Sequence, residues 1–265
     1  MKILYAAAEI SPFARMTHTA DLLRFLPASL QDKGFEIRLL LPKYGSINDR
    51  RNRLHEVIRL AGIKVQVGEN CESMRIKVAS IPNAKLQVYF LDNDTYFKRK
   101  GLFTDPQSGD FFPDNDQRLV FYNKGVLETV KKLGWKPDVI HCHDWASGFV
   151  PVFLKTIYKN DDNFLNTKVV FNVHSATNHG LFDPEILDIM GLPDDFNSSS
   201  VQSGDGKVDF LRAGLAYADH VVTGNELGTE LDDTFASLGI TPDVIQGSPQ
   251  DVSARFADYY KKITE

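Results

Sequence analysis

The feature that most constrains this chain is the alternation of short, continuous apolar runs with longer segments of helical periodicity. Residues 2–8 are almost entirely apolar, a pattern typical of a strand buried on both faces. Leucines recur at helical spacing through residues 22–30, and residues 35–41, mostly apolar, have the pattern of a second strand that ends at Pro42. The sequence therefore predicts a strand, a helix and a second strand in succession. Because Pro27 lies within the helical pattern, where proline is costly, we expect a break in the helix near it.

The same alternation continues beyond residue 86. Residues 242–245 are suited to a last short strand. Repeated units of this kind predict a parallel sheet with helices on both faces. Asp114 followed by Gln117 resembles a capping box at the start of one helix. The expected strands are 86–91, 139–142, 168–173 and 220–223, and the expected helices are 114–134, 145–158, 207–218 and 226–238.

Residues 57–91 depart from this pattern. Residues 63–67 and 74–78 alternate apolar and polar side chains, and the segment between them contains glycine and asparagine. This alternation is typical of an antiparallel hairpin with one solvent-exposed face. We expect the hairpin to be an insertion at the edge of the main sheet.

The length and composition suit one folded domain followed by a terminal helix. The chain has 265 residues, of which 43% are apolar and 25% charged, close to the averages for globular proteins. Four apolar residues of the tail, at spacings of four, three and four, lie on one face of an amphipathic helix. We therefore expect a domain over residues 1–248 and a helix over residues 249–265 that packs on it. The four residues are Val252, Phe256, Tyr259 and Ile263.

The charge balance and the few cysteines exclude several classes of protein. The chain has 30 Lys and Arg residues against 35 Asp and Glu residues, a net charge of -5, so nucleic-acid binding is not expected. Cys71 and Cys142 are too few for a disulfide framework and suit a reducing compartment. No apolar run approaches the ~20 residues of a membrane helix, and Glu9 stops the first run too soon for a signal peptide. The expected location is cytoplasmic, with no membrane partner.

Side chains able to bind a ligand follow three of the predicted strands. In an open parallel α/β sheet, ligands bind at the carboxyl ends of the strands. Carboxylate and imidazole groups hydrogen-bond to hydroxyls, Arg pairs with phosphate, and Trp offers a flat apolar face. The convergence predicts a sugar or phosphate pocket, although each residue alone also fits a structural role. The candidates are Glu9 and Arg15 after the first strand, His143, Asp144 and Trp145 after residues 139–142, and His174 and Asn178 after residues 168–173.

Two short motifs could bind a metal ion, and a structural role is favoured for both. In a strand, His141 and His143 share one face while Cys142 points to the other, so the three cannot easily bind one ion. For the acidic segment 92–94, helix capping is favoured over a metal-binding carboxylate pair. We expect no metal ion and no cofactor.

The turn after the first strand is poorly suited to a nucleotide phosphate. The sequence has no GxGxxG and no GxxxxGK[ST] motif, and residues 12–19 contain no glycine. Every residue of the turn carries a Cβ atom, which hinders close approach of the backbone to a diphosphate. Phosphate binding is therefore not expected at this turn.

Several motifs occur in an order that is specific to one family. The chain opens with MKILYAAAEISP, and further blocks follow to about residue 225. They are Thr19-Ala20-Asp21, Pro113-Asp114-Asn115 through Arg118, 136–141 (KPDVIH) with His143-Asp144-Trp145, Val173-His174, Gly180-Leu181-Phe182, and 210–214 (FLRAG) with Tyr217-Ala218-Asp219. In this order they resemble the bacterial glycogen synthases and plant starch synthases, two-domain GT-B enzymes that transfer glucose from ADP-glucose to an α-1,4-glucan with retention. The resemblance covers the first half of these enzymes. It implies an α/β fold with a Rossmann-like, doubly wound parallel sheet and an inserted antiparallel hairpin.

The resemblance also implies roles for individual residues. His174 would face the transferred glucose, Asp21 and Asp144 would line the cleft, and Trp145 would support it. His174 and Asp144 are thus the candidate catalytic residues of an active enzyme. The candidate substrate-binding residues are Glu9, Asp21, His143, Trp145 and Asn178.

The sequence departs from the family most clearly at the phosphate-binding turn. Arg15 stands at the lysine of the family's Lys-Thr-Gly-Gly, and Thr17 and His18 replace the two glycines. These three residues are therefore expected to form a degenerate turn. The resemblance ends near residue 225, so we expect no counterpart to the family's second domain, which holds most of the ADP-glucose. Further departures are Ser175 for Asn, His179 for Gln, and Gly224-Asn225 for Ser-Pro.

These observations leave three hypotheses for function. The first is a glycogen-synthase-like protein that binds α-1,4-glucan, maltooligosaccharide or a full-length synthase, with weak or no activity alone. In the family, the second domain stabilises the departing ADP. Weak activity is expected without it, because stabilisation of the charge that develops on the leaving group is usually the largest catalytic contribution. The second is an active glucosyltransferase that uses ADP-glucose and is completed by a second chain. The third is a structural module.

Overall fold

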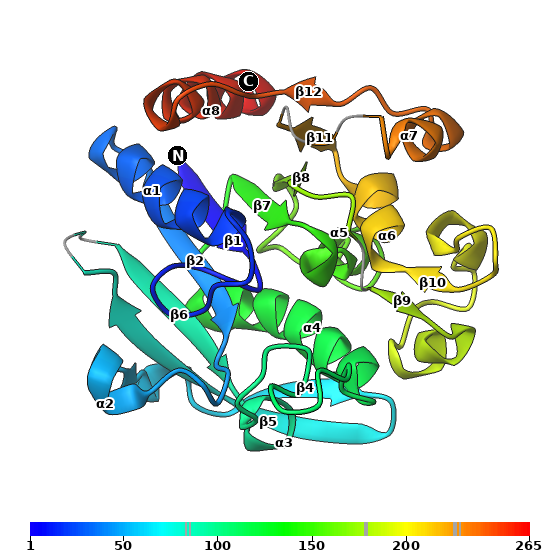
Figure 1. Cartoon of the computed structure of the whole chain (residues 1–265), viewed down its shortest axis with the longest axis horizontal. Coiled ribbons are helices and arrows are strands. Elements are labelled where there is room, and N and C mark those ends of the chain that lie inside the picture. The colour runs from blue at the N-terminus through cyan, green and yellow to red at the C-terminus, as the bar shows by residue number, and fades with distance from the viewer. Residues whose placement is uncertain (83, 85, 178–179, 225–226, 228) are drawn as a thin grey trace.

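A mixed α/β sheet runs through the molecule (Figure 1). The computed structural model describes every residue except 83, 85, 178–179, 225–226 and 228. The strands of the main sheet are β1 (Lys2–Ala6), β2 (Glu36–Pro42), β3 (His55–Glu56), β4 (Ile63–Val67), β5 (Asn70–Ser80), β6 (Gln87–Asp92), β7 (Val139–His143), β8 (Lys168–Val173), β11 (His220–Thr223) and β12 (Asp243–Val244). β9 (Leu181–Phe182) and β10 (Val208–Asp209) form a separate antiparallel pair.

The order of the strands is that of a doubly wound sheet. Along the sheet the described strands lie in the order β12-β11-β8-β7-β1-β2-β6-β5-β3, with β4 paired to β5. All neighbours from β12 to β6 are parallel. The strands from β6 to β11 follow the 3-2-1-4-5-6 order of dinucleotide-binding folds, whose ligands bind where the order reverses. This reversal lies between β1 and β7. The predicted fold class is confirmed.

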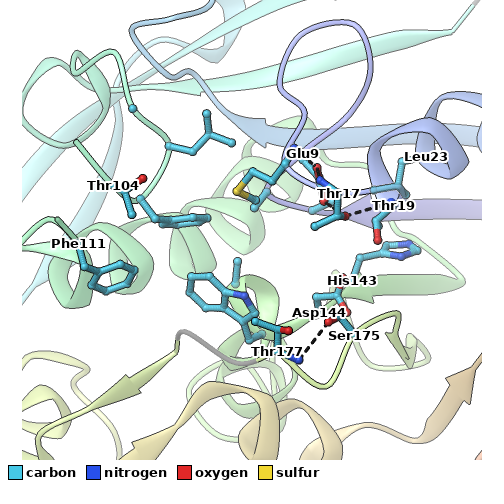
Figure 2. Close-up of a pocket in the computed structure, with 18 of the residues that line it drawn as sticks. Glu9, Thr17, Thr19, Leu23, Thr104, Phe111, His143, Asp144, Ser175 and Thr177 are labelled. Atoms are coloured by element: carbon cyan, nitrogen blue, oxygen red, sulfur yellow. Dashed lines mark hydrogen bonds between the residues drawn. The ribbon is translucent and has the colours of Figure 1, made fainter. Parts of the chain in front are cut away.

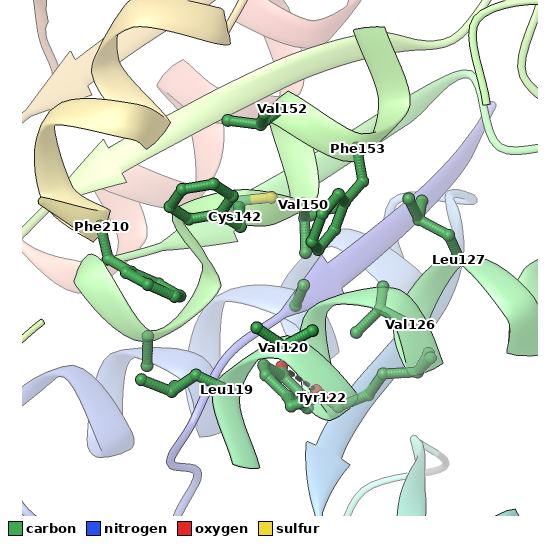
Figure 3. Packing of buried hydrophobic residues seen from close by; sticks show 14 of the residues in the cluster. Leu119, Val120, Tyr122, Val126, Leu127, Cys142, Val150, Val152, Phe153 and Phe210 are labelled. Atoms are coloured by element: carbon green, nitrogen blue, oxygen red, sulfur yellow. Dashed lines mark hydrogen bonds between the residues drawn. The ribbon is translucent and has the colours of Figure 1, made fainter. Parts of the chain in front are cut away.

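Helices cover both faces of the sheet. One face carries α1 (Thr19–Asp32) and α8 (Pro249–Thr264), and the other carries α4 (Asn115–Leu133), α5 (Phe149–Lys155) and α6 (Phe210–Tyr217). The second face holds a closely packed core in which side chains of α4, α5 and α6 meet Cys142 of β7 (Figure 3). Shorter elements are α2 (Asp49–Asn52), α3 (Asp94–Phe97), α7 (Asp232–Leu238) and the 3₁₀ helices η1 (Ile58–Leu60), η2 (Trp145–Ser147), η3 (Pro184–Ile189) and η4 (Ser198–Val201). Among the described residues, no helix is both long and apolar enough to cross a membrane.

The predicted hairpin is present at the edge of the parallel strands. β4 pairs antiparallel with β5 from Ile63 opposite Met74 to Val67 opposite Asn70. The alternate residues Ile63, Val65 and Val67 are buried, and those between them are exposed. β5 also pairs antiparallel with β6, which joins the hairpin to the main sheet. The prediction of an inserted hairpin with one solvated face is therefore confirmed.

Two local predictions are wrong. α1 continues through Pro27 without a break, because Leu23, Leu26 and Pro27 itself are buried and this packing offsets the missing backbone hydrogen bond. The capping box at the start of α4 does not form, since the side chain of Asp114 makes no cap hydrogen bond. Both of its carboxylate oxygens instead accept hydrogen bonds from the Arg99 guanidinium. In the acidic segment, the side chain of Asn93 caps α3, as favoured above.

The terminal helix α8 buries a face displaced from the one predicted. Its buried residues are Ser253, Phe256, Ala257 and Tyr260, whereas Tyr259 is only partly buried. The helix begins with a capping box between Ser248 and Asp251 and packs against α1. The division of the chain at residue 248 stays a prediction.

Candidate functional site

A cavity of about 570 Å³ opens at the carboxyl ends of β1 and β7 (Figure 2). This is the point where the strand order reverses, the usual ligand position in a doubly wound sheet. The volume lies in the range of small-molecule binding sites. Five stretches of chain line it. They are residues 7–9 after β1, Met16, Thr17, Thr19 and Leu23 in the following turn and α1, residues 100–104 with Pro106 and Phe111, residues 143–146 at the end of β7, and Ser175 with Thr177 after β8.

The Glu9 carboxylate holds the turn that follows β1. Its Oε2 atom accepts hydrogen bonds from the backbone N–H groups of Met16 at 2.5 Å and Thr17 at 2.8 Å. Its Oε1 atom accepts a hydrogen bond from the Thr17 hydroxyl. The carboxylate therefore occupies two backbone donors of the turn at which the family resemblance places a phosphate.

Arg15, His18 and Asp21 do not line the cavity. The Asp21 carboxylate accepts a hydrogen bond from the Ser11 hydroxyl at 2.6 Å and pairs with the Arg15 guanidinium at 2.8 Å. Both partners of this ion pair are more than half exposed. His18 is exposed at the start of α1 and its side chain makes no cap hydrogen bond. Of the three residues expected to form the degenerate turn, only Thr17 lines the cavity.

Two histidines meet beside the cavity. His143 Nδ1 lies 2.9 Å from His174 Nε2, and the two rings are nearly parallel, at 6°. His143 is buried and lines the cavity, while His174 is partly exposed and does not line it. Burial lowers the pKa of His143 well below its ordinary value, an effect that His141 and His174 reinforce. His143 is therefore neutral at pH 7, and its tautomer determines whether its Nδ1 atom donates to His174 Nε2 or accepts from it.

Asp144 orients the chain after β8. Its Oδ1 atom accepts the backbone N–H of His174 at 2.7 Å, so the carboxylate holds the residue that the resemblance places opposite the transferred glucose. Burial raises the pKa of Asp144, an effect opposed by His174 and by backbone N–H donors. Asp144 has φ 55° and ψ 179°, a conformation that costs about 1–3 kcal/mol in a residue other than glycine. The structure thus holds strained backbone at the cavity wall.

Aromatic side chains form the opposite wall. Phe103 packs on Trp145 with ring centroids 4.7 Å apart, and Phe111 stands at the mouth with 38% of its surface exposed. The backbone here is held by α4. The Arg118 side chain donates to the Leu102 carbonyl at 2.7 Å, and the Asn115 side chain donates to the Phe103 carbonyl at 2.7 Å. Trp145 is thus part of the cavity wall, and its predicted role in supporting a cleft stays a prediction.

The sequence analysis missed the residues of this wall. Four cavity-lining residues lie in the long connection from β6 to α4, beyond α3, so the search of residues directly after strands passed over them. They are Lys100, Phe103, Thr104 and Phe111. The Asn115 and Arg118 block was noted only as part of the resemblance.

The predicted site residues thus divide into three groups. Those that line the cavity are Glu9, Thr17, His143, Asp144 and Trp145, and those that lie outside it are Arg15, His18, Asp21 and His174. Asn178 and His179 lie outside the described residues. The roles assigned to all of them stay predictions.

Elsewhere, the rings of His141 and His143 lie on one face of β7 with centroids 4.1 Å apart, and Cys142 packs on the other, as expected. Within the described part of the chain, no group of three or more His, Cys, Asp or Glu side chains could hold a metal ion.

The sequence of the chain also matches a known family. The family model described as the starch synthase catalytic domain matches residues 2–226, which is most of the chain. The chain belongs to this family.

Curated relatives and solved structures extend the comparison. The glycogen synthase of Chlorobium limicola is 42% identical over 226 residues, covering 85% of this chain and 46% of that protein. The glycogen synthase of Pelodictyon phaeoclathratiforme is 41% identical over 229 residues, covering 86% of this chain and 46% of that protein. The catalytic domain of starch synthase IV from Arabidopsis thaliana, solved with ADP and acarbose, aligns with a TM-score of 0.74 at 21% identity and covers 93% of this chain and 51% of that one. The chain therefore spans about half the length of the curated relatives it matches.

Proposed function

We propose that this chain binds α-1,4-glucan or maltooligosaccharide in the cavity between β1 and β7, and that alone it transfers glucose weakly or not at all. The observation that carries the proposal is the lining of the cavity. Phe103, Trp145 and Phe111 provide apolar surface on one side, and Thr17, Thr104 and Thr177 provide hydroxyl groups. Sugars need both, because their ring faces are apolar and their edges carry hydroxyls. Membership of the starch synthase family favours a glucan over another sugar.

The turn after β1 supports the second half of the proposal. The family resemblance places two glycines where this chain has Thr17 and His18. The backbone N–H of Thr17 already donates to the Glu9 carboxylate. A diphosphate arriving at this turn would meet a carboxylate and two side chains in place of free N–H groups, so weak binding of ADP-glucose is expected.

An active glucosyltransferase completed by a second chain is the second candidate. It is favoured by the relatives, which are glycogen synthases of about twice the matched length. A partner chain that supplies the groups that bind the nucleotide would leave this cavity to bind the glucan that accepts the glucose. A structural module that binds neither ligand is the third.

Calorimetric titration with maltohexaose and with ADP-glucose separates these candidates. We expect a millimolar dissociation constant for the glucan, about -4 kcal/mol, and no heat from ADP-glucose. Tight ADP-glucose binding, or transfer of labelled glucose to glycogen by the chain alone, would contradict the proposal. Transfer that appears only when a full-length synthase is added would favour the second candidate. The absence of any response to either ligand would favour the third.

A pair of variants tests whether the glucan lies in this cavity. Phe111→Ala removes an exposed ring at the mouth and should weaken maltohexaose binding about fivefold, the effect of one lost aromatic contact. Ile58→Ala is the matched control, because Ile58 is 81% exposed and does not line the cavity. Equal affinities for the two variants would place the glucan elsewhere.

A further inference from the structure

A buried hydrogen-bonded chain joins the terminal helix to the histidines of the site. The Tyr260 hydroxyl on α8 lies 2.6 Å from His141 Nδ1 and 2.9 Å from the Tyr5 hydroxyl on β1. Tyr260, Tyr5 and His141 have no exposed surface. Figure 1 shows α8 beside α1. Tyr260 packs in the same core cluster as Tyr5 and the buried leucines of α1. A residue near the end of the chain thus contacts the centre of the sheet.

Ring packing continues this chain to the cavity. The rings of His141 and His143 lie 4.1 Å apart between centroids. The Tyr5 ring stacks on His143 at 5.5 Å and 15°. His143 in turn shares a hydrogen bond with His174. The path from α8 to the partly exposed His174 therefore consists of two hydrogen-bonded contacts and one ring contact, all of them buried up to His174.

The protons along this path are interdependent. Burial lowers the pKa of His141 and of His143, so both rings are neutral and each carries one proton, on either Nδ1 or Nε2. If Tyr260 donates to His141 Nδ1, the His141 proton must lie on Nε2. The His141 dipole then acts on the adjacent His143 ring in a medium of low dielectric constant, where such effects are strong. The His143 tautomer decides whether its Nδ1 atom donates to His174 Nε2 or accepts from it.

We propose that Tyr260 is a positioning residue, whose hydroxyl fixes the tautomer and orientation of His141 and thereby the hydrogen-bonding state of His143 and His174 at the cavity. α8 then prepares the site for its ligand without touching it, since no residue of α8 lines the cavity. The effect on ligand binding rests on the proposed glucan site. The effect on the histidines does not depend on it.

Tyr260→Phe tests the path directly, because it removes the hydroxyl and keeps the ring. The measurement is the side-chain ¹⁵N spectrum of His143 and His174, assigned by single histidine substitutions, since ¹⁵N shifts report the tautomer. We expect the signals of both residues to move in Tyr260→Phe. Tyr259→Phe is the matched control on the same helix, because the Tyr259 hydroxyl donates to Asp243 and not to a histidine. Unchanged His143 and His174 signals in Tyr260→Phe, or equal changes in the control, would overturn the proposal.

Ligand binding provides a second measurement. Tyr260→Phe should weaken maltohexaose binding about fivefold, the effect of one perturbed hydrogen bond, while Tyr259→Phe leaves it unchanged. Wild-type protein that binds no glucan would contradict the proposed function, and the ¹⁵N spectra would still decide the role of Tyr260. Where Tyr260→Phe fails to fold, Tyr5→Phe replaces it, because it removes the far end of the same hydrogen-bonded chain. Shifted His143 and His174 signals in that variant support the path, and unshifted ones overturn it.

Discussion

Lys124 is a cationic side chain buried on the helix that supports the cavity wall. Its ammonium group donates to the Gln66 carbonyl of β4 at 2.8 Å and lies 5.6 Å from the centre of the Phe153 ring. Burial lowers the pKa of Lys124 to about 8, an effect partly opposed by Glu128. The folded protein therefore carries an amine that releases its proton more readily than it does in the unfolded chain.

The depressed pKa of Lys124 predicts a rise in stability at alkaline pH. Below pH 8 both states hold the proton and the full cost of burying the charge applies. Between pH 8 and about 10.5 only the unfolded state stays protonated, so the free energy of unfolding rises, by at most about 3 kcal/mol before solvent screening. Urea unfolding of the wild type between pH 7 and 9.5 should show this rise relative to Lys124→Met. Parallel pH profiles of the two proteins would disprove it.

At the scale of elements, α5 and α6 pack closely because a glycine lies at the contact between them. Gly148 lies at the start of α5, and a Cβ atom there would stand 1.7 Å from the Phe210 carbonyl oxygen. Its φ of -64° is ordinary for any residue, so space and not backbone conformation requires glycine. This contact matters for the site because the segment just before Gly148 carries Asp144 and Trp145.

Gly148→Ala should destabilise the protein by at least about 2 kcal/mol, because backbone of one element must move away from the other. Gly204→Ala is the control, since nothing lies within 4 Å of the added Cβ atom, and it should change stability by less than about 0.5 kcal/mol. Chemical denaturation of the two variants measures the difference. A Gly148→Ala protein as stable as the control would show that the elements are not in close contact.

At the scale of the whole molecule, the central strands of the sheet are shielded from solvent much better than the edge strands. β1, β7 and β8 lie at its centre, with neighbours on both sides and almost wholly buried residues. β3 and β12 are two-residue strands at the two edges, and their residues are exposed. The cavity lies at the ends of the most protected strands, a rigid position suited to placing side chains accurately.

The rates of backbone hydrogen exchange should follow this difference in solvent protection between central and edge strands. Backbone amides of β1, β7 and β8 should exchange only through global unfolding, and amides of β3 and β12 should exchange orders of magnitude faster through local opening. Mass spectrometry of peptides from exchanged protein resolves these strands. The hairpin strand β4 provides an internal comparison, because it pairs on one side only and should be intermediate. Fast exchange throughout β1 would be inconsistent with the fold.

Much of the architecture could be predicted from local sequence patterns. Apolar runs located β1, β2, β6, β7, β8 and β11 within one or two residues, and strict alternation located the hairpin. The prediction failed where side chains distant in sequence decided the outcome. The predicted stripe of α8 omitted Tyr260, because a tyrosine beside Tyr259 gives no local sign of which ring is buried. Tyr260 is buried because Tyr5 and His141 satisfy its hydroxyl.

The amino-acid sequence by itself determined the parallel sheet, its hairpin and the strand ends at which a site can form. Buried side chains recur along the chain at the spacing set by the strand or helix that carries them, so local patterns reveal these elements. Only the tertiary structure decided the partners of the polar groups. Glu9 binds the turn residues, Asp114 binds Arg99 in place of a helix N–H, and Tyr260 reaches His141. Each choice depends on which donor lies within about 3 Å in three dimensions, and hydrophobic periodicity carries no information about that distance.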